Sequence, residues 1–434
     1  MQNSDFDSHF NIEYITSAKD SQYIIKEIDI EHIRKKIETP FKIFPGNGIN
    51  EYDAKNIADH ISHPIFEYQK FVAGFRSWNS LFHLLTESGQ DRVHRLDSFF
   101  NIKKRLWNSA LTTISLVFPK NPFIDNYFGS SDSERVVPSL DESSYICLLD
   151  YIHSASKAFI LAPDIRLEKN DGISRESYID YMDRTVSILS DMNNKPIFVP
   201  IHIELSKNNL ETILDHYSKM GYCNLWVNFD AKTCSGTYAS RLRTIIHFIE
   251  RNFDPKTVTL YYSHIKKEIT PNVQDEKVAA SDIFTQFYGA DFVGIDREPW
   301  RGGIAIDWDN DDSLRETATK HNFSTPEEYR EAYMLHKHRI FDPDSYYYYN
   351  INRYPGELAV DSDLLLRDNS INRLYNGILM SVEIERTKDK IEETRSLKQY
   401  LDSKSACTDN PRLIDSIITP ERQSDLVEFL GNMK

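Results

Sequence analysis

Acidic and histidine side chains stand at the ends of several apolar runs in the middle of the chain. Carboxylates and imidazoles are the groups that most often act as nucleophiles, general acids and bases, or metal ligands in proteins. If the runs are parallel strands of one barrel, their carboxyl ends lie at one rim and bring these groups together. The residues that follow this pattern are Asp164, His202, Glu204, Asp230, His264, Asp296 and Glu298.

The segment 296–301, with the sequence DREPWR, directly follows the last of these runs. A carboxylate on a rigid strand end, here Asp296, is suited to act as a nucleophile or a base. Trp300 is suited to stacking on a planar group, and Arg301 to binding a phosphate or a carboxylate. The alternative is that Asp296 caps the next helix or pairs with an arginine.

Asp97 is the candidate for a second carboxylate. If it faces Asp296, the two would form a general acid/base pair. The alternative is that Asp97 and Ser98 cap the start of a helix.

His202 and His264 alternate with apolar neighbours at two of the predicted strand ends. Together with Asp164 or Glu204 they are compatible with the metal site of a barrel hydrolase. No H-x-H pair or helical H-x-x-x-H supports a metal site in these strands, so hydrogen-bonded barrel histidines are the favoured interpretation. The four cysteines, which form no C-x-x-C pair, indicate free thiols rather than a disulfide framework or a zinc knuckle. No metal and no cofactor is therefore expected.

The elements that must position these residues alternate between strand and helix. Near-continuous apolar strands separated by helices indicate parallel strands that are buried on both faces. A doubly wound sheet also fits this alternation, but no strand is followed by its G-x-G-x-x-G turn. Since polar residues recur at the strand ends, the pattern favours an α/β fold of the (β/α)8 barrel type. The predicted strands are 158–164, 196–203, 224–230, 258–264 and 291–296, and the predicted helices are 174–190, 208–220, 242–252 and 281–288.

The flanking regions are less regular. A strand is predicted within 37–46, mostly helix over 54–85, and loop over 119–143, while 307–355 receives no assignment. A charged helix is predicted over 371–403, with an inner face listed as Ile384, Ile391, Leu397 and Leu401. The predicted division is a barrel over 1–360 and a helical extension over 361–434.

The chain has 434 residues and a formal net charge of −15. No apolar run is long enough to cross a bilayer, and the N-terminus lacks a basic-then-apolar leader, so a cytoplasmic protein is expected. A surface that grips nucleic acid is usually basic, so any such surface here must be a local patch.

Three stretches resemble the tRNA-guanine transglycosylase superfamily, and its archaeal members in particular. Residues 37–40 with 44–45 are similar to the family's early "ETP…P" strand. Residues 289–291 and then Asp296 resemble the "G-x-D-x-F-D" strand that carries the nucleophile, with two extra residues before Asp296. Adding Trp300 and Arg301 makes this stretch resemble the D-x-x-x-W-R of DNA-modifying relatives. The helix from Tyr375 to Leu401 resembles the family's closing helix.

The chain also departs from the family pattern. Asp97-Ser98-Phe99-Phe100 lacks the glycines of "DSGGFQ", and 201–204 and 228–230 lack the paired glycines of the base pocket. A close approach of backbone to a purine needs such glycines. The zinc ligands are absent as well, because no cysteine lies between Asp296 and Cys407 and Tyr375 stands in place of the ligand histidine.

The resemblance implies exchange of a guanine base in nucleic acid through a covalent aspartyl intermediate. Asp296 would attack the ribose and Asp97 would deprotonate the incoming base, which would be of the 7-deazaguanine type. Asp164, His202 and Glu204 would line the base pocket, with Trp300 and Arg301 near the nucleotide. The expected polymer is tRNA, with DNA as the second choice, and a homo- or hetero-dimer is compatible with the family.

Two alternatives remain open. One is a member of the same fold that no longer catalyses and serves as a partner subunit or a nucleic-acid-binding module. The other is an unrelated metal-dependent barrel hydrolase or lyase that acts on a small molecule through Asp164, His202, His264 and Asp296.

Overall fold

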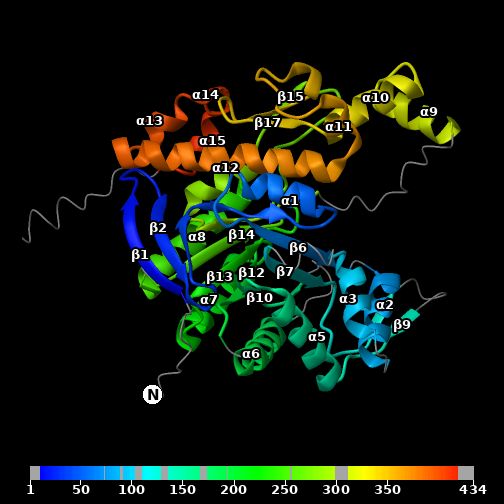
Figure 1. Cartoon of the computed structure of the whole chain (residues 1–434), viewed down its shortest axis with the longest axis vertical. Coiled ribbons are helices and arrows are strands. Elements are labelled where there is room, and N and C mark those ends of the chain that lie inside the picture. Colours follow the sequence, from blue (N-terminus) through cyan, green and yellow to red (C-terminus); the bar gives the residue numbers. More distant parts are fainter. Residues whose placement is uncertain are drawn as a thin grey trace, which may run out of the picture.

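The computed structural model describes residues 10–72, 74–87, 91–102, 110–128, 135–166, 174–192, 194–254, 257–298 and 311–418. Its centre is a ring of parallel strands (Figure 1). Two of the eight positions in the ring are each occupied by a pair of short consecutive strands. In ring order the strands are β4 and β5 (Phe41–Lys42 and Phe44–Pro45), β6 (Ile65–Phe71), β7 (Leu111–Phe118), β10 and β11 (Ile160–Leu161 and Asp164–Ile165), β12 (Ile197–His202), β13 (Asn224–Asn228), β14 (Thr259–Ser263) and β16 (Phe292–Val293).

The strand pairings close the ring. In the last pairing β16 returns to the first position, with Phe292 opposite Phe41. The split positions continue the ring on both sides, because β5 pairs with β6 while β4 pairs with β16, and β11 pairs with β7 while β10 pairs with β12. The predicted (β/α)8 barrel is therefore confirmed, and the doubly wound alternative is excluded.

Helices connect the strands and cover the outside of the barrel (Figure 1). Several begin with a side chain that accepts a hydrogen bond from the first turn, as Ser174 does from Ser177 and Ser206 does from Asn209. Their apolar faces pack on the strands. These outer helices are α1 (Glu51–Ala58), α2 (Phe75–Thr86), α3 (Arg92–Phe100), α5 (Glu142–Ala155), α6 (Arg175–Asp191), α7 (Lys207–Met220), α8 (Thr237–Asn252) and the 3-10 helix η2 (Asp282–Tyr288).

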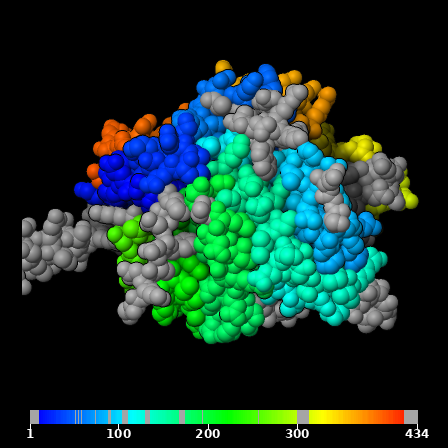
Figure 2. All heavy atoms as spheres, turned by 60° about the horizontal axis from the view of Figure 1, so that its bottom comes forward, coloured from blue at the N-terminus to red at the C-terminus, as the bar shows by residue number. Residues whose placement is uncertain are grey.

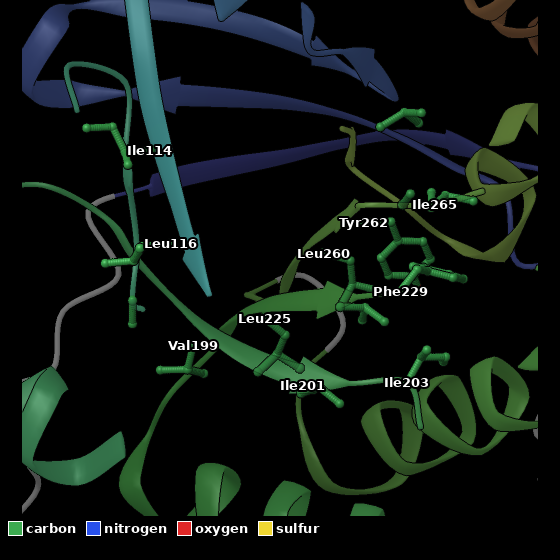
Figure 3. Packing of buried hydrophobic residues seen from close by; sticks show 14 of the residues in the cluster. Ile114, Leu116, Val199, Ile201, Ile203, Leu225, Phe229, Leu260, Tyr262 and Ile265 are labelled. Atoms are coloured by element: carbon green, nitrogen blue, oxygen red, sulfur yellow. The ribbon is translucent and has the colours of Figure 1, made fainter. Parts of the chain in front are cut away.

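Alternation along the strands separates two apolar clusters. Outward-pointing side chains meet the helices, and Figure 3 shows part of this layer, including Ile114, Val199 and Leu225. Inward-pointing side chains such as Phe198 and Trp226 fill the barrel itself. Because the alternation has period two, the residues at the carboxyl ends of the strands also divide into inward and outward sets.

A small antiparallel sheet closes the amino end of the barrel. It consists of β1 (Phe10–Ser17), β2 (Ile24–Ile30) and β3 (Lys35–Thr39). Phe10 belongs to the cluster inside the barrel, and its ring centroid lies 5.8 Å from that of Phe198. In the space-filling view of Figure 2 the N-terminal residues, in dark blue, lie against the green middle part of the chain.

The helix predicted over 371–403 is two helices. The first, α12 (Asn369–Thr394), lies across one side of the barrel (Figure 1), and after a break at Arg395 the chain continues as the short α13 (Leu397–Leu401). Gly377 allows this close packing, since a Cβ there would lie 3.1 Å from the ring of Phe44. All four residues predicted for the inner face are buried. The elements around α12 are β15 (Lys277–Ala279), α9 (Asp311–Lys320), α10 (Pro326–Lys337), β17 (Ile340–Asp342), β18 (Tyr347–Tyr349), η3 (Ile351–Arg353), α11 (Ser362–Arg367), α13 (Leu397–Leu401), α14 (Ser405–Asp409) and α15 (Pro411–Asp415).

Two predictions for the N-terminal third were wrong. Residues 54–85 are not mostly helical, because they contain β6, the second barrel strand, between α1 and α2. The predicted loop over 119–143 contains a short hairpin of β8 (Asn126–Phe128) and β9 (Arg135–Val137). The third barrel strand, β7, was not predicted. Within the described residues, no helix combines the length and apolar character that crossing a membrane requires.

Candidate functional site

The carboxyl ends of the barrel strands bring most of the predicted residues together. Below the rim, four side chains form a chain of hydrogen bonds across the barrel interior. Asn228 Nδ2 donates to Asp164 Oδ2 at 2.6 Å, and His264 Nδ1 lies 2.9 Å from Asn228 Oδ1. His264 Nε2 lies 3.0 Å from Glu67 Oε1 on β6. These groups are fully buried, so they form the floor of the site rather than its open surface.

Glu67 and His264 form a buried pair at the centre of this floor. Burial alone would raise the pKa of Glu67, but hydrogen bonds and charge from His264, with hydrogen bonds from Ser115 and Tyr261, hold it below its ordinary value. An ionised Glu67 beside Nε2 and an amide oxygen beside Nδ1 give both ring nitrogens of His264 an acceptor. The interpretation of His264 as a hydrogen-bonded barrel histidine is therefore supported.

Asp164 has internal partners on both oxygens. Its Oδ1 accepts from Tyr178 at 3.0 Å and from its neighbour Ile165, while Asn228 donates to Oδ2. Burial raises the pKa of Asp164, although the nearby His202 opposes this. Asp164 therefore belongs to the buried floor of the site, and its carboxylate is not exposed.

His202, Glu204 and Asp230 form the one group in the described residues with the donor types and spacing of a metal site. Their ligand atoms all lie within 4.8 Å of one another. His202 Nδ1, however, accepts a hydrogen bond from the backbone N–H of Glu204, so the proton of the neutral ring sits on Nε2. A protonated Nε2 has no lone pair for a metal.

Nearby cations also neutralise the negative charges of the two carboxylates in this group. Asp230 Oδ2 pairs with Arg166 Nε at 3.1 Å, and its Oδ1 pairs with Arg297. Glu204 pairs with Lys232 at 3.2 Å. The residues present therefore do not fit a divalent cation.

The backbone is strained at the same place. Asp230 and Ala231 have φ values of 42° and 61°, and His264 on the next strand has 61°. Residues other than glycine rarely adopt this left-handed backbone conformation, and such strain concentrates at functional sites. The strained residues directly follow β13 and β14, at the carboxyl ends of these strands.

Asp296 lies at the end of the eighth strand position, between the barrel and α12. Arg373 of α12 donates from Nε and Nη2 to Oδ1, at 3.1 and 3.0 Å, and also to the backbone oxygen of Asp296. Among the described residues, Oδ2 has no hydrogen-bond partner. Asp296 thus pairs with an arginine, as the alternative interpretation held, but one oxygen remains open.

A cavity of about 20 Å³ adjoins Asp296, which is room for about one water molecule. Lys42 of β4, Lys267, Asp282 of η2 and Tyr348 of β18 line it with Asp296. A purine is too large for this cavity, so a base would have to bind outside it, next to Asp296.

The two carboxylates of this cavity have pKa values shifted in opposite directions. Burial raises the pKa of Asp282 to about 7, although Lys42 and a hydrogen bond from Tyr348 oppose the rise. Burial would also raise the pKa of Asp296, but the positive charges of Arg373, Lys267 and Lys42 hold it below its ordinary value. Near neutral pH one carboxylate is ionised while the other retains a substantial protonated fraction.

Asp97 lies elsewhere. It is inside α3 on the outer layer, where Tyr151 of α5 donates to its Oδ1 at 2.9 Å. It is not among the residues of the Asp296 cavity. It does not cap the helix either, because α3 begins after Asp91. Trp300 and Arg301 lie outside the described residues.

Several residues of the site were not predicted. Glu67 falls in the segment assigned to helix, and Asp282 was read only as part of a helix. Arg373 comes from α12, far along the chain from Asp296. The signal that remained in the sequence was the apolar character of the residues around Glu67, namely Ile65, Phe66 and Tyr68.

The strand that resembles the transglycosylase nucleophile strand differs from the family pattern at the position of the nucleophile. Asp291 forms a salt bridge with Lys26 at 3.0 Å and takes part in closing the amino end. The residue three positions later is Gly294, where a Cβ would lie 2.4 Å from the Cβ of Ser263. No side chain fits there, so Asp296 is the carboxylate that this strand offers.

Comparisons with known proteins name no family. No family model matches the chain, and no curated protein matches it. Among solved structures, an endo-β-1,4-mannanase double mutant from Cellulomonas fimi is 12% identical over 68% of this chain and 72% of its own, with a TM-score of 0.34. A GH26 β-mannanase from Bacteroides ovatus is 10% identical over 68% and 92%, with a TM-score of 0.32. Scores this low carry no argument about activity, and the barrel assignment rests on the strand pairing.

Proposed function

We propose that this chain is a barrel enzyme that exchanges a guanine-type base at a glycosidic bond in nucleic acid, with tRNA as the first candidate and DNA as the second. Asp296 is the proposed nucleophile. Its place at a strand end, its depressed pKa and its open Oδ2 support this role. The resemblance of the strand and the closing helix to the transglycosylase superfamily supplies the substrate class.

The observation that carries the proposal is the pair of opposed carboxylates. Two acids whose surroundings separate their pKa values are suited to separate tasks, one as an ionised nucleophile and one as a proton donor and acceptor. Asp282 takes the second task in place of Asp97. It shares with Asp296 a cavity that has room for about one water molecule, and such a water would carry the proton between Asp282 and a base bound next to Asp296.

The proposed reaction has two balanced steps. First, Oδ2 of Asp296 bonds to C1′ of the ribose while the C1′–N bond breaks, and the leaving base takes a proton from Asp282. Second, the nitrogen of an incoming 7-deazaguanine-type base attacks C1′, its proton passes to Asp282, and the carboxylate of Asp296 leaves. The target base must first leave its stack, which costs a few kcal/mol.

The test is exchange of labelled guanine into bulk tRNA, with double-stranded DNA in parallel. The wild type should incorporate label, and Asp296→Asn should reduce incorporation to the background level. Asp215→Asn is the matched control, because Asp215 is a half-exposed, ion-paired carboxylate on the outer helix α7. Its exchange rate should equal that of the wild type.

Two results would contradict the proposal. Exchange that persists in Asp296→Asn would remove the assigned nucleophile. Binding of tRNA without any exchange by the wild type would identify a partner subunit or binding module instead.

A further inference from the structure

The group around Asp230 has more hydrogen-bond donors than acceptors. Arg166 uses only Nε for Asp230, and Arg297 uses only one Nη. Within the described residues, the other guanidinium nitrogens of both arginines have no partner. The side chain of Arg166 is 37% exposed and that of Arg297 is 11% exposed, so neither is closed off from solvent.

His202 adds a further donor. Its side chain is fully buried, and Nε2 has no hydrogen-bond partner. The nearest carboxylate oxygen, Oδ2 of Asp230, is 4.0 Å away, which is too far for a hydrogen bond. Because the backbone of Glu204 fixes the proton on Nε2, the missing partner must be an acceptor. A buried donor without an acceptor is destabilising, and a ligand oxygen would remove that cost.

The charges favour an anion over a cation. Arg166, Arg297 and Lys232 are positive, while Asp230 and Glu204 are negative, which leaves one net positive charge when His202 is neutral. Burial lowers the pKa of Arg297 to about 10, and the charge of Arg166 contributes to the same shift. The two guanidinium groups therefore repel each other, and a bound anion would relieve this repulsion.

The geometry of the arginines is held fixed. Asp230 lies buried between them and binds one guanidinium on each oxygen. The guanidinium of Arg297 also lies over the ring of Phe71, 3.1 Å from its centroid. Two fixed guanidinium groups and an imidazole N–H, all gathered around Asp230, supply enough unused donors for the several oxygens of a phosphate group.

We infer that Arg166, Arg297 and His202 form a phosphate-binding subsite at the carboxyl end of the barrel, anchored from below by Asp230. The phosphate is either the monoester of a nucleotide or sugar phosphate, or the diester of a polynucleotide backbone. The assignment does not depend on the proposed chemistry at Asp296, because binding is measurable whether or not the protein turns over a substrate.

The test is calorimetric titration of the full-length protein at constant ionic strength with three probes. The probes are inorganic phosphate, a 5′-mononucleotide and a single-stranded oligonucleotide without terminal phosphates. Wild-type protein should bind at least one of them, and Arg166→Met and Arg297→Met should each weaken that binding at least tenfold. Arg184→Met is the matched control, since Arg184 is 39% exposed and pairs with Glu142 on the outer surface, and it should leave the affinity unchanged.

The pattern across probes separates the two sources of phosphate. Arginine-dependent binding of inorganic phosphate and mononucleotide alone indicates a monoester, and arginine-dependent binding of the oligonucleotide indicates a backbone diester. Thermal unfolding without ligand serves as the folding control, and a variant that keeps the wild-type Tm but not the affinity supports the subsite.

Three results would overturn the inference. One is equal phosphate affinity in the wild type and both arginine variants. Another is the absence of binding to all three probes. The third is stoichiometric uptake of a divalent cation that disappears in His202→Ala, which would restore the metal interpretation of this group.

Discussion

At the residue scale, the central feature is that Asp282 and Asp296 share a cavity but differ in protonation. Lys42 and Lys267 lie in the same cavity, and Arg373 acts directly on Asp296. The cations therefore favour the ionised form of Asp296 more than that of the more deeply buried Asp282. The opposite pKa shifts of the two carboxyl groups arise from their positions in the fold, and neither shift would exist in the unfolded chain.

The activity should depend on pH through Asp282. Its protonated form donates to the leaving base, so kcat/KM should fall as the pH rises above about 7. Asp282→Asn should lower kcat/KM by about 10²- to 10⁴-fold and remove this alkaline limb. Rates of guanine exchange from pH 5 to 9, with Asp215→Asn as the control, provide the measurement. An unchanged alkaline limb in Asp282→Asn would show that another group is titrating.

The same pKa shift makes a prediction for stability. Between its ordinary value of 3.8 and about 7, the folded protein keeps the Asp282 proton while the unfolded chain loses it. The protonated carboxyl group therefore contributes fully to the free energy of unfolding at low pH. This contribution is lost as the pH rises from 3.8 to about 7, with a slope of at most about 1.4 kcal/mol per pH unit. Urea unfolding should show wild type losing stability relative to Asp282→Asn from pH 4 to 7. A constant difference over that range would refute the raised pKa.

The buried pair of Glu67 and His264 should be important for stability. Removing one partner of such a pair leaves an uncompensated buried charge, so Glu67→Ala should lower the free energy of unfolding by about 3–5 kcal/mol. Glu27→Ala, at a partly exposed carboxylate paired with Lys36, should change it by less than about 1 kcal/mol. Both values are obtained from urea titrations at pH 7. A loss below about 1 kcal/mol for Glu67→Ala would mean that the floor carries no charged pair.

At the scale of elements, α12 completes the candidate site from outside the barrel. It supplies Arg373 and packs against the first strand position through Gly377, which lies over Phe44. Its contacts with β17 include a hydrogen bond from the backbone N–H of Phe341 to Asn376 at 2.8 Å. The helix thus fixes the position of the arginine relative to Asp296.

Enlarging Gly377 should separate α12 from the barrel. Gly377→Leu should destabilise the protein by about 1–3 kcal/mol through overpacking, and it should weaken exchange activity because Arg373 moves with the helix. Val382→Leu on the exposed part of the same helix is the control. Thermal unfolding and exchange rates measured together provide the test. A Gly377→Leu variant with wild-type stability and rate would show that the helix does not position the site.

The secondary structure was predicted well where the strands are apolar on both faces. The predicted strands from 158 to 296 are near-continuous apolar runs, and each has a corresponding barrel strand. The second barrel strand escaped prediction because Glu67, Gln69 and Lys70 interrupt its apolar pattern. Glu67 points into a polar interior, which local sequence does not reveal.

At the scale of the whole molecule, the barrel depends on a closed amino end. The N-terminal sheet inserts Phe10 into the inner cluster beside Phe198 and Phe292. Phe10→Ala should lower the stability by about 3–5 kcal/mol, whereas Tyr14→Ala, at an exposed residue of the same strand, should have little effect. Denaturant midpoints of the two variants compare them directly. Equal midpoints would mean that the sheet does not close the barrel.

The candidate site was predicted only in part, and the reason lies at this scale. Asp296, His202 and His264 could be predicted because strand ends are local features. Asp282 and Arg373 could not, because their approach to Asp296 depends on how a 3-10 helix and a C-terminal helix pack on the finished barrel.

The most direct test of the proposed chemistry is to locate a covalent intermediate. The protein is incubated with tRNA, or with DNA in a parallel sample, quenched in acid, digested and examined by mass spectrometry. The proposal predicts a peptide containing Asp296 that carries a ribosyl or deoxyribosyl adduct, and no such peptide in Asp296→Asn. An adduct on another residue, or base exchange without any adduct, would contradict it.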